Sequence, residues 1–94
     1  DYPDADLEAA ILCSESGIDS RIAGQLVSSG AAARRLKGHG LDEGISTRLL
    51  VYAATLIERG VAPADACRMA LVRPITDDRD IRDTLDHAID AIFA

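Results

Sequence analysis

The sequence has 94 residues, of which 48% are hydrophobic and 28% are charged, a balance expected of one small soluble globular domain or of a piece of a larger one. Its net charge of −6, without a basic stripe or a platform of aromatic side chains, argues against nucleic-acid binding. It has no apolar run near the ~20 residues that cross a bilayer and no signal-peptide pattern, which argues against membrane association and favours a cytoplasmic protein. Only Tyr2, Tyr52 and Phe93 are aromatic, and abundant Ala and Leu favour helices around an aliphatic core.

A first helix is expected from about Asp4 to Ser16, where Gly17 stops it. Four residues at helical spacing are expected to form one face of it: Leu7, Ala10, Ile11 and Ser14. The helix should therefore pack against the rest of the chain through this face.

A second helix is expected after Asp19, a good N-cap, with Ile18 placed to staple its entry. Ser28, Ser29 and Gly30 weaken its middle, where a kink or a break stays open. Its apolar positions are Ile22, Leu26, Val27 and Ala33. Its end carries three bases, Arg34, Arg35 and Lys37. Cations suit the negative end of a helix dipole, so this interpretation is preferred over contact of these bases with a ligand or partner.

The stretch from Gly38 to Gly60 combines a glycine-rich loop with the most apolar helix of the chain. Ser46 is placed to cap this helix, and Gly60 to close it in a left-handed conformation. Its apolar residues are Leu49, Leu50, Val51, Ala53, Ala54, Leu56 and Ile57. A helix that is apolar nearly all round is expected in the middle of a bundle.

Two more helices complete the chain. A fourth is expected from Val61 to Arg73, with Pro63 in its first turn and Pro74 at its end. Its buried stripe is expected to be Ala66, Met69, Ala70 and Leu71. Thr76 is expected to cap the last helix, whose apolar positions are Ile81, Leu85, Ala88, Ile89 and Ile92 and whose solvated face is Asp83, Asp86, His87 and Asp90. Together these elements predict a single all-α domain over residues 1–94, a compact bundle of about five helices without a sheet.

Arg48 is the strongest functional candidate. It falls in the first turn of the central helix, where the backbone already presents about half a positive charge, so a cation is mildly unfavourable unless an anion joins it. Arg48, with the capping Ser46 and with Thr47 beside it, is therefore a candidate site for a phosphate group. The alternative is an arginine that turns into water or pairs with Asp42 or Glu43, and spacing alone slightly favours that alternative.

Other candidates for chemistry are weaker. His39 and His87 have no partners at metal-ligand spacing, and the aspartates at 77, 78 and 80 suit the helix dipole better than Mg²⁺ or Ca²⁺. Cys13 and Cys67 are interpreted as reduced thiols, with a disulfide left open. No serine has a histidine placed to activate it, and no G-x-x-x-x-G-K-[ST] loop is present. We therefore expect no metal site and no catalytic residue in this chain alone.

Three stretches carry a resemblance to a known family: GHGLDEGISTRLLVYAATLIERG, CRMALVRPITDD and IRDTLDHAID. They resemble the C-terminal part of the CbbQ/NorQ/NirQ group of MoxR-type AAA+ ATPases, and the opening DYPD resembles the segment that joins that family's core domain to its helical lid. The likeness covers essentially the whole chain and is strongest from Gly38 to Ala54. By this resemblance Arg48 matches the sensor-2 arginine, which reaches from the lid to the γ-phosphate of ATP held by the core.

The resemblance implies partners and cofactors that the chain itself does not contain. The complete protein is expected to use ATP and Mg²⁺ in an α/β core, and the isolated lid is expected to have negligible affinity for ATP and not to hydrolyse it. Family members form rings, work with a partner that carries a von Willebrand factor A domain, and remodel a target metalloenzyme: Rubisco in one branch, nitric oxide reductase in the other. The competing interpretation is a stand-alone helical module for protein–protein interaction.

Overall fold

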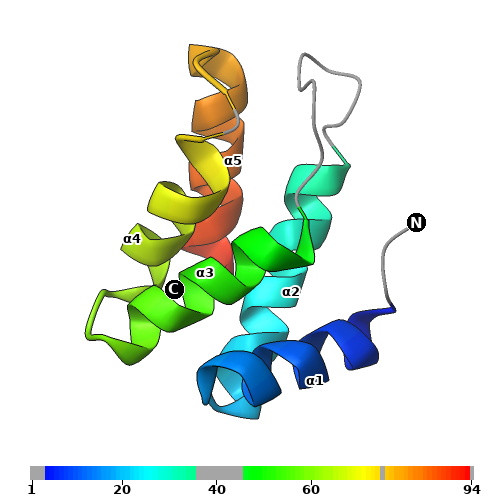
Figure 1. Ribbon diagram of the computed structural model, residues 1–94. Coiled ribbons are helices and arrows are strands. Elements are labelled where there is room, and N and C mark those ends of the chain that lie inside the picture. The colour runs from blue at the N-terminus through cyan, green and yellow to red at the C-terminus, as the bar shows by residue number, and fades with distance from the viewer. Residues whose placement is uncertain (1–3, 36–45, 75, 94) are drawn as a thin grey trace.

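The computed structural model describes residues 4–35, 46–74 and 76–93, and these form helices with no strand among them. In chain order they are α1 (Ala5–Ser16), α2 (Ser20–Arg34), α3 (Thr47–Glu58), α4 (Pro63–Cys67), which continues as the π-helix η1 (Arg68–Val72), and α5 (Arg79–Ile92) (Figure 1). The predicted all-α class is therefore confirmed.

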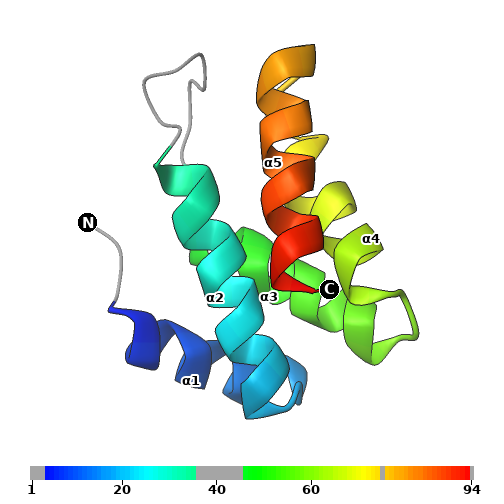
Figure 2. The same ribbon diagram turned by 180° about the vertical axis from the view of Figure 1, so that it is seen from behind.

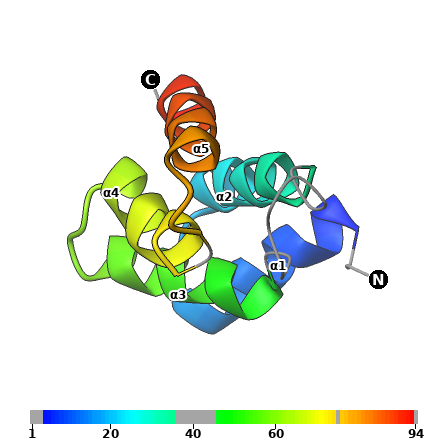
Figure 3. The same ribbon diagram turned by 90° about the horizontal axis from the view of Figure 1, so that it is seen from above.

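The helices pack around α2 and α3. Viewed from above, α2 lies between α3 and α5, with α1 on one flank and α4 on the other (Figure 3). From behind, α2 and α5 lie side by side in front of α3 (Figure 2). The buried core draws large side chains from α1, α2, α3, η1 and α5: Leu12, Leu26, Leu50, Leu71, Leu85 and Ile89. The core is aliphatic, as the composition predicts.

Two predicted N-caps, Asp19 and Ser46, are confirmed, and Asp4 caps α1 in the same way although no cap was predicted there. The side chain of Asp4 accepts a hydrogen bond from the Leu7 N–H, that of Asp19 from Ile22, and that of Ser46 from Leu49. Gly17 and Gly60 have positive φ angles of 80° and 102°, as predicted for residues that end helices in the left-handed region.

The predicted cap of the last helix is wrong by two residues. Asp78, rather than Thr76, caps α5, since its Oδ1 accepts hydrogen bonds from the N–H groups of Asp80 and Ile81 at 2.9 and 3.2 Å. The Thr76 hydroxyl instead accepts from the Asp78 N–H at 2.9 Å, while its own N–H is donated to the Val72 carbonyl. A carboxylate that reaches two donors is the stronger cap, and Thr76 orders the turn before it.

The fourth helix differs from its prediction in bounds and in type. It begins at Pro63 rather than Val61, and from Arg68 it widens into a π-helix in which the Arg73 N–H bonds to the Arg68 carbonyl at 3.0 Å. The wider turn takes the following residues out of α-helical register. Met69, predicted in the buried stripe, is 37% exposed.

The open question about α2 has a clear answer, because the helix runs without a break from Ser20 to Arg34. The Ser29 hydroxyl is donated to the Gln25 carbonyl at 3.0 Å, one turn earlier. Gly30 is buried against α3, and a Cβ at this position would lie 3.1 Å from Leu50 Cδ1. The glycine therefore serves a close approach of two helices.

Two predictions about buried faces are wrong. On α1 the buried side chains are Glu8 and Leu12, whereas Leu7 is 53% exposed. α3 is not enclosed on all sides: its buried residues are Leu50, Ala53 and Ala54, and Tyr52 is 48% exposed. In α1 and α3, apolar residues at helical spacing predict that a helix is present but not which of its sides packs against the neighbouring helices.

Candidate functional site

The start of α3 is built by Ser46. This residue has extended backbone angles, its hydroxyl accepts a hydrogen bond from the Leu49 N–H at 3.3 Å, and its carbonyl accepts from Leu49 and Leu50. The first N–H groups of any α-helix have no partner within the helix, and they add to the positive end of its dipole. An anion would be stabilised at this point.

Arg48 is the second residue of α3 and is exposed. In the described ranges 4–35, 46–74 and 76–93, no carboxylate forms an ion pair with it. Its two alternative partners, Asp42 and Glu43, lie outside these ranges, as do His39 and the loop glycines. The guanidinium is thus at the surface, beside a helix start whose field favours an anion.

Thr47 contacts a buried charged pair that the sequence did not reveal. Its hydroxyl is donated to Glu8 Oε2 at 2.7 Å, while the Arg34 guanidinium donates to both oxygens of Glu8 at 2.8 Å each. The Glu8 side chain is 1% exposed and that of Arg34 is 12% exposed. We call Glu8, Arg34 and Thr47 the Glu8 cluster; it joins α1, the last turn of α2 and the first residue of α3.

The Glu8 cluster keeps its carboxylate ionised. The two hydrogen bonds from Arg34 lower the pKa of Glu8; burial acts in the opposite direction, and the bond from Thr47 lowers it further. A charged carboxylate that accepts from a fork of two N–H groups has a fixed plane as well as a fixed position. The cluster is therefore a rigid link between three helices.

Sequence reasoning assigned other roles to two members of this cluster. Arg34 was predicted to act on the dipole of its own helix; it does lie in the last turn of α2, but its guanidinium reaches Glu8 of α1. Thr47 was predicted with Ser46 and Arg48 as a nucleotide contact, and that role stays a prediction. The one signal for Glu8 is its spacing, four residues before the buried Leu12 and so on the same helix face.

Comparison with known proteins places this chain in a family. Residues 8–92 match the family described as CbbQ/NirQ/NorQ C-terminal. The chain belongs to this family. The matched range contains the whole Glu8 cluster and the start of α3.

Three relatives of the CbbQ/NirQ/NorQ group show how much of each protein the chain covers. It is 55% identical to protein CbbQ of Hydrogenophilus thermoluteolus over 94 residues, which are 100% of this chain and 35% of the relative. It is 53% identical to the denitrification regulatory protein NirQ of Pseudomonas aeruginosa over 78 residues, 83% of this chain and 30% of that protein. It is 41% identical to protein NorQ of Paracoccus denitrificans over 93 residues, 99% of this chain and 34% of that protein. The chain thus spans about a third of the length of these relatives.

A second charged group in this CbbQ/NirQ/NorQ domain joins η1 to α5. Arg68 of η1 forms ion pairs with two carboxylates of α5, Asp86 at 3.2 Å and Asp90. A third carboxylate, that of Asp65 in α4, lies 3.6 Å from the Arg68 guanidinium. Asp86 and Asp90 were predicted to be simply solvated, so this pairing corrects that interpretation. The group links the π-helix to α5 through ion pairs between the Arg68 guanidinium and the carboxylates of Asp86 and Asp90.

The remaining candidates within the described residues include two cysteines and a histidine. Burial raises the pKa of Cys67 to about 11, which keeps the thiol protonated and poorly nucleophilic. Cys13 and Cys67 are both free thiols, so they do not form the disulfide that the sequence left open. His87 is exposed and its Nδ1 lies 2.8 Å from the Asp83 carbonyl oxygen. Within the described residues, no cluster of three metal-binding side chains occurs and no helix has the length and apolarity to span a membrane.

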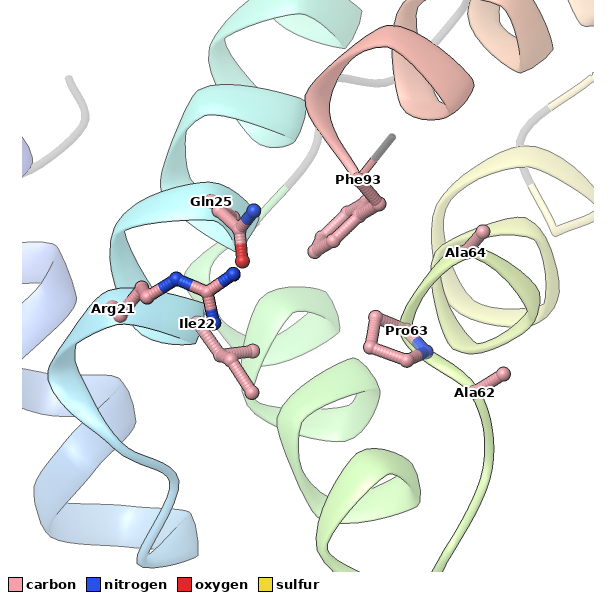
Figure 4. Close-up of a pocket in the computed structure, with 7 residues that line it drawn as sticks. All are labelled: Arg21, Ile22, Gln25, Ala62, Pro63, Ala64 and Phe93. Carbon is pink, nitrogen blue, oxygen red and sulfur yellow. The ribbon is translucent and has the colours of Figure 1, made fainter.

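A small pocket lies between α2, the start of α4 and the end of α5 (Figure 4). Its volume is about 290 Å³, and no residue of the α3 start lines it. The lining residues are Arg21, Ile22, Gln25, Ala62, Pro63, Ala64 and Phe93. The Gln25 side chain spans the space between two of these helices, because its Nε2 donates to the Ile92 carbonyl at 3.1 Å. The pocket is thus separate from the candidate anion site.

Proposed function

We propose that this chain is the C-terminal lid of an ATP-driven AAA+ remodelling protein, in which Arg48 contacts the γ-phosphate of ATP held by a separate core domain. The observation that carries the proposal is the exposed guanidinium of Arg48 at the positive end of a capped helix, without a described carboxylate partner. Such a guanidinium is stabilised by the negative charge of a polyphosphate and can bind it through two parallel N–H···O hydrogen bonds.

The mechanism follows from the difference between ATP and ADP. A hydrogen bond to a charged group contributes about 1.5–3 kcal/mol, and this contact exists only while the γ-phosphate is present. Its loss on hydrolysis removes a reason for the lid to stay closed over the nucleotide. Arg48 would therefore convert the state of the nucleotide into a position of the lid.

The other parts of the proposed machine lie outside this chain. The core domain would supply the phosphate-binding loop and the Mg²⁺ ligands, and neighbouring subunits would complete a ring. A partner with a von Willebrand factor A domain and a target metalloenzyme in the cytoplasm complete the proposal. Relatives named CbbQ, NirQ and NorQ are all similar to this chain. The proposal therefore includes both target branches, Rubisco and nitric oxide reductase.

The test is ATP turnover by the full-length protein carrying Arg48→Ala. We expect kcat/KM for ATP to fall about tenfold or more, since tenfold corresponds to about 1.4 kcal/mol and the lost contact is worth at least that much. The matched control is Arg59→Ala, which removes an exposed arginine beyond the other end of α3 and should leave turnover unchanged. Unchanged turnover in Arg48→Ala would refute the sensor role.

A second candidate, a stand-alone interaction module, is favoured by the exposed apolar side chains Leu7 and Tyr52, at 53% and 48%. The two candidate functions predict different open reading frames. An open reading frame that encodes a phosphate-binding loop upstream of this chain supports the lid, and one without such a loop supports the module.

A further inference from the structure

The Glu8 cluster has a feature that stability alone explains poorly. Taking two charges out of water costs several kcal/mol per ion, and well-packed apolar residues in the same place often give an equally or more stable protein. Here the cost is offset with complete pairing: Glu8 accepts three hydrogen bonds at 2.7–2.8 Å, and no buried side-chain polar atom in the described residues lacks a partner. What such a cluster supplies beyond an apolar contact is a fixed direction.

The direction that it fixes is that of the α3 start. Thr47 is the first residue of α3, and its hydroxyl is donated to a carboxylate that Arg34 holds in plane with two hydrogen bonds. The β-branched side chain of Thr47 has few rotamers, so a hydroxyl held at one point also holds the backbone of this residue. Arg48 projects from the next residue and has no ion pair of its own in the described chain.

We propose that Glu8, held by Arg34, is a positioning residue that fixes Thr47 and thereby aims Arg48 at its anion. This inference rests on the proposed function and adds two residues to it, Glu8 of α1 and Arg34 of α2. The Thr47 hydroxyl then faces the protein interior, and it acts on the nucleotide through Arg48 rather than by touching it.

The test is a double-mutant cycle in the full-length protein, with kcat/KM for ATP as the measured quantity. Thr47→Val removes the hydroxyl, keeps the shape of the side chain and leaves the Glu8–Arg34 pair intact, so the protein should fold. We expect a loss of roughly tenfold, because misplacing a binding group by about an ångström costs up to about a hundredfold. Thr47→Ser, which keeps the hydroxyl, should recover most of the loss, and Glu8→Gln should reproduce it.

The Arg48→Ala background separates positioning from other roles. If Thr47 acts only through Arg48, then Thr47→Val lowers kcat/KM in the wild-type background and has no further effect in Arg48→Ala. An equal loss in both backgrounds, as expected for general destabilisation or for direct contact of Thr47 with ATP, overturns the inference. No loss from Thr47→Val beside a clear loss from Arg48→Ala overturns it as well, and leaves the proposed function standing. No loss from Arg48→Ala removes the proposed function and this inference together.

Discussion

At the scale of single residues, Glu8 makes the stability of the fold depend on pH. The hydrogen bonds from Arg34 lower the pKa of its carboxyl in the folded state, whereas in the unfolded chain it titrates near the ordinary value of about 4.3. The unfolded state therefore binds a proton at a higher pH than the folded state does. The stabilising contribution of Glu8 is fully present above the ordinary pKa and is lost as the pH falls through the lower, folded value.

We expect Glu8→Gln to lower the free energy of unfolding at neutral pH by about 3 kcal/mol, because it removes the buried charge that accepts two hydrogen bonds from Arg34. The difference from wild type should shrink as the pH falls through the folded pKa, where the wild-type carboxyl also becomes neutral. Urea unfolding over a range of pH, followed by far-UV circular dichroism, measures both quantities. Glu15→Gln, at an exposed position of the same helix, is the control and should change stability by less than about 0.5 kcal/mol. A deficit of Glu8→Gln that is independent of pH would contradict the assignment.

Two helix caps could be predicted from the sequence, whereas the partners of Glu8 could not. Asp19 and Ser46 were predicted as caps because a cap acts on a backbone N–H only three residues away. Glu8 finds its partners 26 and 39 residues along the chain. Nothing local distinguishes this carboxylate from an exposed one, so the cluster emerges only when three helices are packed together.

At the scale of the elements, the crossing of α2 and α3 depends on Gly30. Helix propensity disfavours glycine within a helix, and the sequence was read there as a weak point. In the structure both methyl carbons of Leu50, which is fully buried, lie 3.1–3.2 Å from the position of an added Cβ. The missing side chain thus sets the distance between two helices, and the cost in propensity is offset by this packing.

Gly24 lies in the same helix and provides a matched comparison, since a Cβ there would meet nothing within 4 Å. We expect Gly24→Ala to raise the free energy of unfolding by about 0.5–1 kcal/mol, the difference in helix propensity. Gly30→Ala gains the same propensity, but overpacking costs about 1–3 kcal/mol, so we expect a net loss of about 1 kcal/mol. Urea unfolding of the two variants checks the signs. Stabilisation by both substitutions to the same extent would show that α3 can move away freely.

The type of an element is predicted less well than its existence. Five helical segments were expected from periodicity and caps, and five α-helices are present in the described residues. The π-helix at Arg68–Val72 was not expected, because its apolar residues read equally well with an α-helical period. Arg68, its first residue, forms ion pairs with Asp86 and Asp90 of α5.

At the scale of the whole molecule, the fold class followed from composition and the surroundings of α3 did not. Apolar residues nearly all round a helix predict that it is enclosed, yet Tyr52 is 48% exposed and Leu49, Val51, Leu56 and Ile57 are only partly buried. A bundle this small has too few helices to cover both sides of α3. The uncovered side, close to Arg48 in the chain, suits a surface that another domain covers in the proposed lid.

The five α-helices and the π-helix all contribute side chains to one buried core. This predicts that the 94-residue chain folds on its own in one cooperative transition. A ligand that binds the folded state raises the melting temperature in proportion to RT ln(1 + [L]/Kd), so the same experiment measures binding. We expect millimolar Mg·ATP to leave the melting temperature of the isolated chain unchanged, because one guanidinium and a helix start offer too few contacts without a phosphate-binding loop or Mg²⁺ ligands. Sodium sulfate at matched ionic strength, and the Arg48→Ala chain, control for salt effects. A shift with Mg·ATP that Arg48→Ala abolishes would mean that this domain holds a complete nucleotide site, and the division of labour between lid and core would be wrong.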